Sequence, residues 1–136
     1  AGQERYKCIS TNTIQLADGF LIVFSVTDKK SFELLDKWVN NINDSVDIKS
    51  KILILAGNKA DIEDDKREVS REEAENYANL NNFLYFETSA KSGLNIKEVF
   101  NKLYEDIFNL NKKLTDRKNI QLTKEDKNKN KKKKKC

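Results

Sequence analysis

The sequence predicts an α/β fold with a mostly parallel sheet. Three short apolar runs have the length and continuity of buried strands, and segments with helically spaced apolar residues lie between them. Strands that alternate with helices imply crossover connections, which place the strands parallel in one sheet. Such sheets bind ligands at the carboxyl ends of their strands. We therefore expect a functional site where the apolar runs end.

The first apolar run, Phe20–Val26, is almost continuous, which is typical of a strand covered on both faces. A helix is expected to follow from Lys29 to Asp44. Its apolar residues recur at helical spacing, so Trp38 is interpreted as a packing residue rather than as a platform for a ligand. The expected buried stripe is Leu35, Trp38, Val39, Ile42 and Val46.

The second and third strands are expected at Lys51–Ala56 and Phe83–Phe86. Between them, Ser70 and Glu73 have the spacing of a capping box, in which the serine caps a helix and the glutamate returns to the serine N–H. The residues expected on the buried face of that helix are Ala74, Tyr77 and Ala78.

The longest helix is expected to begin with a cap at Asn95 and to end near Leu114. Residues 115–136 are poor in apolar side chains and rich in lysine, which predicts a disordered, solvated tail. The chain therefore divides into a domain of residues 1–114 and a basic tail of residues 115–136. The expected inner face of the long helix is Ile96, Val99, Phe100, Leu103, Ile107, Leu110 and Leu114.

Composition narrows the possible functions. The net charge of +4 comes from the tail, so the domain is near neutral and no nucleic-acid partner is expected for it. No apolar run approaches the length of a membrane span, and no secretory signal is visible. Cys8 and Cys136 are far apart, so a structural disulfide is not expected and a reducing compartment fits. The chain contains no histidine, which excludes a histidine base.

Two polar motifs follow the second and third apolar runs: Asn-Lys-Ala-Asp at 58–61 and Glu-Thr-Ser-Ala-Lys at 87–91. The Asp61 carboxylate can accept two hydrogen bonds as a fork, which matches the N1–H and amino donors of guanine. Adenine lacks that pair, and a site of this kind rejects such analogues by roughly 10⁴–10⁵. Either motif alone could be an ordinary polar turn. Their occurrence together, with Ala-Gly-Gln-Glu at 1–4, favours guanine recognition.

In these stretches the chain resembles the Ras superfamily of small GTPases, over residues 1 to about 114. The resemblance implies the small GTPase (P-loop NTPase) fold, a three-layer α/β sandwich. It implies that the Lys59 stem covers the base plane and that the backbone at 89–91 contacts the guanine carbonyl. The implied guanine-binding residues are Asn58, Lys59, Asp61, Ser89, Ala90 and Lys91.

The resemblance also implies catalytic roles at the start of the chain. Gly2 corresponds to the loop that senses the terminal phosphate, and Gln3 to the residue that orients the attacking water. The family binds GTP or GDP with Mg²⁺ and hydrolyses GTP. The region from Gln3 to Ile14 corresponds to switch II, which contacts exchange factors, activating proteins and effectors.

The phosphate half of the family's site has no counterpart in this sequence. No Gly-x-x-x-x-Gly-Lys-Ser/Thr loop occurs, and the switch threonine and the motif aspartate are also missing, so no Mg²⁺ ligand can be assigned. We therefore expect the chain to be the C-terminal two-thirds of a small GTPase, without its N-terminal strands. As given, it is expected to be inactive as a GTP hydrolase.

The end of the chain, Lys131–Lys135 followed by Cys136, resembles the lipid-anchor tails of Ras and Rab proteins. A prenyl group on Cys136 and the lysines would together hold the protein on the cytoplasmic face of a membrane, and the unprenylated form would be cytosolic. A nuclear import signal or a nucleic-acid arm are the alternatives.

Some motifs of this chain resemble Rab proteins and others resemble Ras proteins. Three functions are considered for it. The first is a membrane-anchored switch in membrane traffic or signalling that cycles between GTP and GDP. The second is a truncated pseudo-GTPase that acts only as a binding module. The third is a basic protein directed to nucleic acid.

Overall fold

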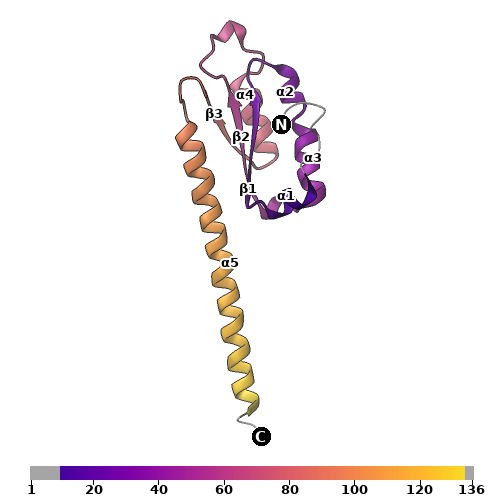
Figure 1. Ribbon diagram of the computed structural model, residues 1–136, viewed down its shortest axis with the longest axis vertical. Coiled ribbons are helices and arrows are strands. Elements are labelled where there is room, and N and C mark those ends of the chain that lie inside the picture. The colour runs from indigo at the N-terminus through magenta and orange to yellow at the C-terminus, as the bar shows by residue number, and fades with distance from the viewer. Residues whose placement is uncertain (1–9, 134–136) are drawn as a thin grey trace.

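A computed structural model describes residues 10–133, without the side chains of 126 and 130–133. Its centre is a parallel sheet in the order β1–β2–β3, formed by Gly19–Ser25, Ile52–Asn58 and Leu84–Glu87. Ser25 pairs with Asn58, and Gly57 pairs with Glu87, so the three carboxyl ends lie at one edge. Within the described residues, the predicted α/β class and the parallel sheet are confirmed (Figure 1).

The central strand β2 is buried from Leu53 to Gly57, because it has a strand on each side and helices on both faces. In β1, Ile22 and Phe24 are buried, but Val23 is 55% exposed. The prediction that β1 is covered on both faces is therefore wrong for one face. The reason is that β1 is an edge of the described sheet, and α5 lies mainly over β2.

One face of the sheet is covered by four helices: α1 (Thr11–Leu16), α2 (Lys29–Glu33), α3 (Leu35–Ser45) and α4 (Arg71–Leu80). The helix predicted from Lys29 to Asp44 is broken at Leu34, which separates α2 from α3. Within its predicted stripe, Leu35 and Ile42 are fully buried. The buried residues of this layer and of the facing strands are Ile14, Ile22, Phe24, Val26, Leu35, Ile42, Leu53, Leu55, Val69, Ala74 and Ala78.

The predicted N-cap of α4 is confirmed, since the Ser70 hydroxyl accepts a hydrogen bond from Glu73 N at 3.1 Å. The second half of the predicted capping box is wrong. The Glu73 carboxylate pairs with the ammonium of Lys29 and does not return to the Ser70 N–H. A cation within reach binds a carboxylate more strongly than a neutral amide does, so Glu73 joins α4 to α2 instead.

The other face of the sheet is covered by α5, Ile96–Lys133 (Figure 1). Val99 is buried against the sheet, and a Cβ at Gly19 would touch Leu103 and Ile107. Two residues of the predicted inner face are exposed instead: Phe100 by 56% and Leu114 by 47%.

The structure also differs from the sequence prediction beyond residue 114, where α5 continues to Lys133. No glycine or proline follows Gly93, and residues 115–133 are rich in lysine, which favours helix. Every described side chain from 111 to 129 is exposed, so this part of α5 depends on local propensity alone. The helix passes residue 114 without a break, and its described side chains are exposed from residue 111 onward.

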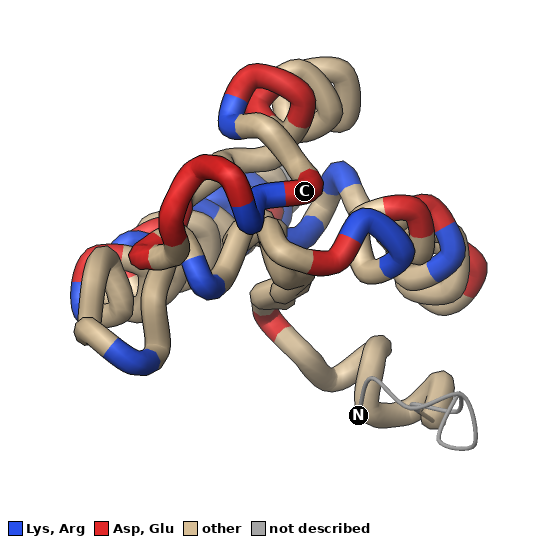
Figure 2. Tube along the Cα trace, turned by 90° about the horizontal axis from the view of Figure 1, so that it is seen from above, with Lys and Arg blue, Asp and Glu red and all other residues tan. Residues whose placement is uncertain are grey.

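Charges are mixed over the folded part, and Figure 2 shows blue and red segments interspersed rather than gathered by sign. In the part of the chain that the structure describes, no helix has the length and apolar character to cross a membrane.

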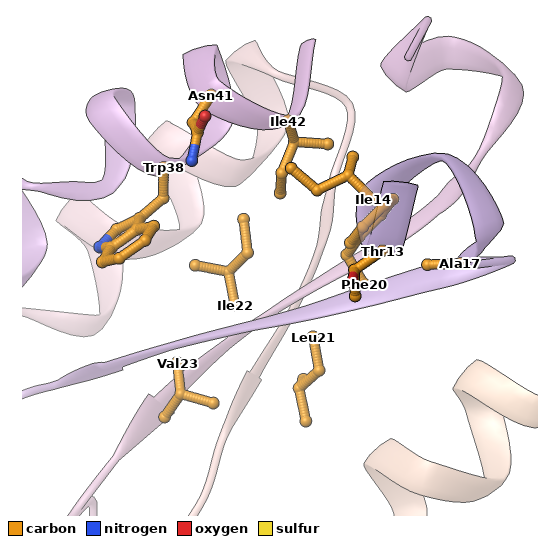
Figure 3. A pocket seen from close by; sticks show the side chains of 10 residues that line it. All are labelled: Thr13, Ile14, Ala17, Phe20, Leu21, Ile22, Val23, Trp38, Asn41 and Ile42. Carbon is orange, nitrogen blue, oxygen red and sulfur yellow. The ribbon is translucent and has the colours of Figure 1, made fainter. Parts of the chain in front are cut away.

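A hollow of about 490 Å³ lies between α1, β1 and α3, bordered by Ile14, Trp38 and Ile42 (Figure 3). Leu21 and Val23 point to the opposite side of β1 from Ile22 in the same view.

Candidate functional site

The two polar motifs meet at the carboxyl edge of the sheet. Asn58 is the last residue of β2, and Glu87 is the last residue of β3. The Asn58 side-chain oxygen accepts hydrogen bonds from Ala90 N at 3.1 Å and from the Thr88 hydroxyl at 3.3 Å. Segments thirty residues apart in sequence are therefore joined directly by one amide side chain.

Backbone contacts extend this connection past the strand ends. Thr88 N donates to Gly57 O at 2.8 Å, and Ala60 N donates to Thr88 O at 2.9 Å. Between these two bonds the chain turns at Lys59, which has a φ of 63° in the left-handed region. The turn places the Lys59 and Asp61 side chains outside the sheet, where both are exposed.

Asp61 is the side chain of the first motif with the greatest capacity to bind a ligand. Its carboxylate makes no hydrogen bond or ion pair with residues 10–133, so both oxygens can accept from a ligand. Lys59 lies two residues away, with an exposed aliphatic stem that can cover a planar ring. A ligand with two adjacent donors and an aromatic face matches this pair.

The second motif forms a tight loop from 88 to 95. Ser89 is fully buried, and its hydroxyl accepts from Ser92 N at 3.0 Å, so this side chain shapes the loop. Gly93 N donates to Ser89 O at 2.8 Å, and Gly93 has a φ of 83° that favours glycine. The Lys91 N–H makes no hydrogen bond in the described part of the chain and can serve a ligand oxygen.

Asn95 closes this loop in a way that the sequence did not predict. Its side-chain amide donates to the Glu87 carbonyl at 2.8 Å, and its φ is 56°. The long helix α5 begins at Ile96, directly after the expected cap residue, and the Asn95 side chain ties the start of α5 to the end of β3. The loop between them is held at both ends.

Sequence reasoning missed a cluster of three polar side chains behind the motifs: Arg67, Tyr85 and Glu87. Arg67 Nη1 donates to the Glu87 carboxylate at 2.7 Å, and Nη2 donates to its other oxygen. The Tyr85 hydroxyl donates to the same carboxylate. The only sequence signal was the position of Glu87 and Tyr85 on one face of β3, directly before the second motif.

The cluster is electrostatically coupled. Burial alone would raise the pKa of Glu87, but the hydrogen bonds from Arg67 and Tyr85 outweigh it and leave that pKa below its usual 4.5. The hydrogen bond to Glu87 raises the pKa of Arg67. Burial, together with the bond to Glu87, raises the pKa of the Tyr85 hydroxyl. Arg67 and Glu87 are therefore charged and Tyr85 is neutral around pH 7.

Several predicted site residues lie outside the described part of the chain: Gly2, Gln3, Cys136 and the side chains of Lys131–Lys135. Of the predicted site residues, the structure places Asn58, Lys59, Asp61, Ser89, Ala90 and Lys91 together at the sheet edge. Among residues 10–129, no group of three or more aspartate, glutamate or cysteine side chains could hold a metal ion.

Comparison with known proteins shows the family of this chain. The model of the Ras family matches residues 1–109. The chain is 44% identical to rat Ras-related protein Rab-13 over 107 residues, which is 79% of this chain and 52% of that protein. It is 39% identical to Rab-10 of Diplobatis ommata over 124 residues, covering 90% and 61% of the two chains. Human Rab-8B is 40% identical over 117 residues, with 85% and 56% covered. The chain thus spans little more than half the length of these curated relatives.

Proposed function

Because this chain belongs to the Ras family, we propose that it carries the guanine-recognition part of a small GTPase of the Rab type. The observation that supports this most is the free Asp61 carboxylate beside the loop at 88–91. Asp61 would accept from the N1–H and amino groups of guanine. The Lys59 stem would cover the ring, and the Lys91 N–H would donate to the guanine carbonyl oxygen.

Asn58 has a different role in this proposal. Its side-chain oxygen already binds Ala90 N and the Thr88 hydroxyl, so it holds the two loops at a fixed spacing. Ala90 would contribute through that contact, and the buried Ser89 through the shape of its loop. A pocket whose walls are fixed before the ligand arrives loses less entropy on binding, which increases affinity.

The complete activity requires more than these residues. We propose that the GTP- and GDP-bound states, Mg²⁺ binding and GTP hydrolysis depend on a phosphate loop that this sequence does not contain. Gly2 and Gln3 would act in hydrolysis, with Gln3 holding the attacking water. By itself the chain would bind guanine weakly, without tight Mg²⁺-dependent binding of GTP, because the triphosphate would have no partner.

Regulators and a membrane are the proposed partners. Exchange factors, activating proteins and effectors would contact the region from Gln3 to Ile14. A prenyl group on Cys136, supported by Lys131–Lys135, would anchor the protein on the cytoplasmic face of a membrane, where it would regulate traffic or signalling. A pseudo-GTPase that serves only as an anchored binding module would share the anchor but would not discriminate among bases.

Ligand-observed NMR tests the base site on the 136-residue chain. Saturation transfer from the protein to GMP is compared with transfer to AMP at equal millimolar concentrations. The proposal predicts transfer to the guanine H8 proton and little transfer to the adenine protons. Asp65→Asn, which changes an exposed carboxylate in the same loop, should leave the preference intact. Equal transfer to GMP and AMP would overturn the proposed function.

A further inference from the structure

We propose that Arg67, Glu87 and Tyr85 position the two base-recognition loops and thereby set the affinity for guanine without touching it. This inference rests on the proposed function, since it concerns the same pocket. Arg67 and Glu87 are separated by 20 residues in sequence and meet through two parallel hydrogen bonds. A guanidinium and a carboxylate paired in this way have a fixed relative orientation as well as a fixed distance.

Glu87 is the residue that both loops share. Its carboxylate holds Arg67, which lies at the end of the loop that begins after Asn58. Its main-chain carbonyl accepts from the Asn95 side chain, which closes the loop that begins at Thr88. One residue therefore fixes the far end of the first loop and the far end of the second.

Arg67 has a second attachment that limits its movement. Its Nε donates to Val69 O at 2.5 Å, and Val69 N donates to Val26 O at 3.0 Å. Val26 and Val69 are both fully buried. The Arg67 side chain is thus bonded both to Val69, which belongs to the core, and to Glu87. The loop between Lys59 and Arg67 therefore ends at a residue that is held by two contacts.

Tyr85 holds the carboxylate from the sheet side. Its ring stacks against Phe24 at a centroid distance of 6.2 Å, and it lies so close to Gly57 that a Cβ there would be 2.3 Å from the hydroxyl. Only glycine leaves room for the tyrosine in this position. The contacts with Phe24 and Gly57 position the ring, and its hydroxyl donates to the Glu87 carboxylate.

The cluster is shielded from water, which makes it suitable for this role. The side chains of Arg67 and Glu87 are 16% and 11% exposed, whereas those of the pair Arg71–Glu75 on α4 are 69% and 47% exposed. Screening by solvent weakens exposed pairs much more than buried ones. The Arg67–Glu87 pair is connected to the pocket through Thr88, which directly follows Glu87 and whose backbone bonds to Gly57 O and Ala60 N.

The experiment compares Arg67→Gln and Tyr85→Phe with the control Arg71→Gln, which makes the same change of charge on the exposed pair. Hydrogen exchange without nucleotide is followed in peptides covering 58–66, 88–95 and the buried strand 52–57. Saturation-transfer titration with GMP is then performed on each variant of the 136-residue chain. Arg67→Gln is expected to accelerate exchange in both loops by about tenfold and to raise the Kd for GMP by about tenfold. Tyr85→Phe should have the same effects, smaller in size, and Arg71→Gln should have neither.

The outcomes separate a positioning role from general stabilisation. Faster exchange of the two loops, with no change in strand 52–57, supports positioning. Equal acceleration of all three peptides means that the cluster only stabilises the fold, and overturns the inference. Unchanged GMP affinity in Arg67→Gln and Tyr85→Phe, in a wild-type chain that prefers GMP to AMP, overturns the positioning role alone. A wild-type chain without that preference overturns the proposed function and the inference with it.

Discussion

Replacing Gly57 with alanine should destabilise the fold by about 1–2 kcal/mol. The new Cβ would lie 2.3 Å from the Tyr85 hydroxyl and 3.0 Å from Phe24 Cζ. Moving the hydroxyl away would break its bond to the Glu87 carboxylate, a loss of about 1.5–3 kcal/mol for a hydrogen bond to a charged group. Keeping the bond would instead leave overpacking strain of about 1–3 kcal/mol. The lower backbone entropy of unfolded alanine offsets about 0.5–1 kcal/mol of either loss.

Urea denaturation followed by the fluorescence of Trp38, the single tryptophan, measures this loss at submicromolar concentration. Gly19→Ala is the matched control in an edge strand. Its Cβ would meet Ile107 Cδ1 at 2.7 Å, the far end of a flexible side chain that can rotate away. The effect of Gly57→Ala should fall by more than half in a Tyr85→Phe background, where the hydroxyl is gone. Equal losses in both backgrounds, or equal losses at Gly19 and Gly57, would refute this reasoning.

Four other predictions concern the edge, the acid range, the tail and hydrolysis. The chain should self-associate through the edge of β1. Because charge opposes strand pairing, Val23→Lys should shift the chain toward monomer in sedimentation velocity. An unchanged sedimentation coefficient in Val23→Lys would contradict this prediction. Because the folded-state pKa of Glu87 lies below 4.5, its stabilisation should be complete above about pH 4.5 and decline as pH falls through the folded value. Urea midpoints of wild type and Glu87→Gln should therefore converge in acid, and a constant difference would argue against it. Cys136→Ser should move the protein from membranes to cytosol on fractionation, and an unmodified thiol in the mass of membrane-recovered protein would exclude the anchor. In a form that includes a phosphate loop, Gln3→Leu should retain GTP binding and hydrolyse slowly in single-turnover assays; an activated rate equal to wild type would remove Gln3 from the mechanism.

The strands and the meeting of the motifs could be predicted because both depend on local pattern. The continuous apolar run at 52–56 requires burial, and parallel strands bring their carboxyl ends to one edge. From those two facts, Asn58 and Ser89 are expected at the same edge of the sheet. The cap at Ser70 was predictable for the same reason, since its bond joins residues only three positions apart.

The remaining features depend on contacts between distant segments, which periodicity does not encode. Glu73 pairs with Lys29 instead of returning to its own cap, and the Asn95 side chain donates to the Glu87 carbonyl, because the fold brings these partners within reach. The pairing of Arg67 with Glu87 is of the same kind. Phe100 belongs to the apolar pattern of the long helix but remains exposed. The pattern identifies the apolar face of a helix, but it does not show which other elements cover that face.

The extension of α5 beyond residue 114 reflects a competition that composition alone does not decide. Few apolar residues and many lysines predicted disorder, whereas the absence of glycine and proline allows the helix to continue. The exposed side chains at 111–129 give this segment no tertiary support. Its helicity should therefore respond to salt and temperature more than that of residues 96–110.

The proposed guanine site is tested most directly by a substitution at Asp61 that should change the preferred base from guanine to xanthine. In Asp61→Asn, the side-chain oxygen still accepts from N1–H, while the new N–H repels the guanine amino group and matches the carbonyl that xanthine has there. Two hydrogen bonds of about 1 kcal/mol each correspond to roughly a thirtyfold change in relative affinity. Saturation-transfer titration of the variant should show XMP bound more tightly than GMP, with wild type and Asp65→Asn showing the reverse. Unchanged GMP affinity and no gain for XMP in Asp61→Asn would contradict the account.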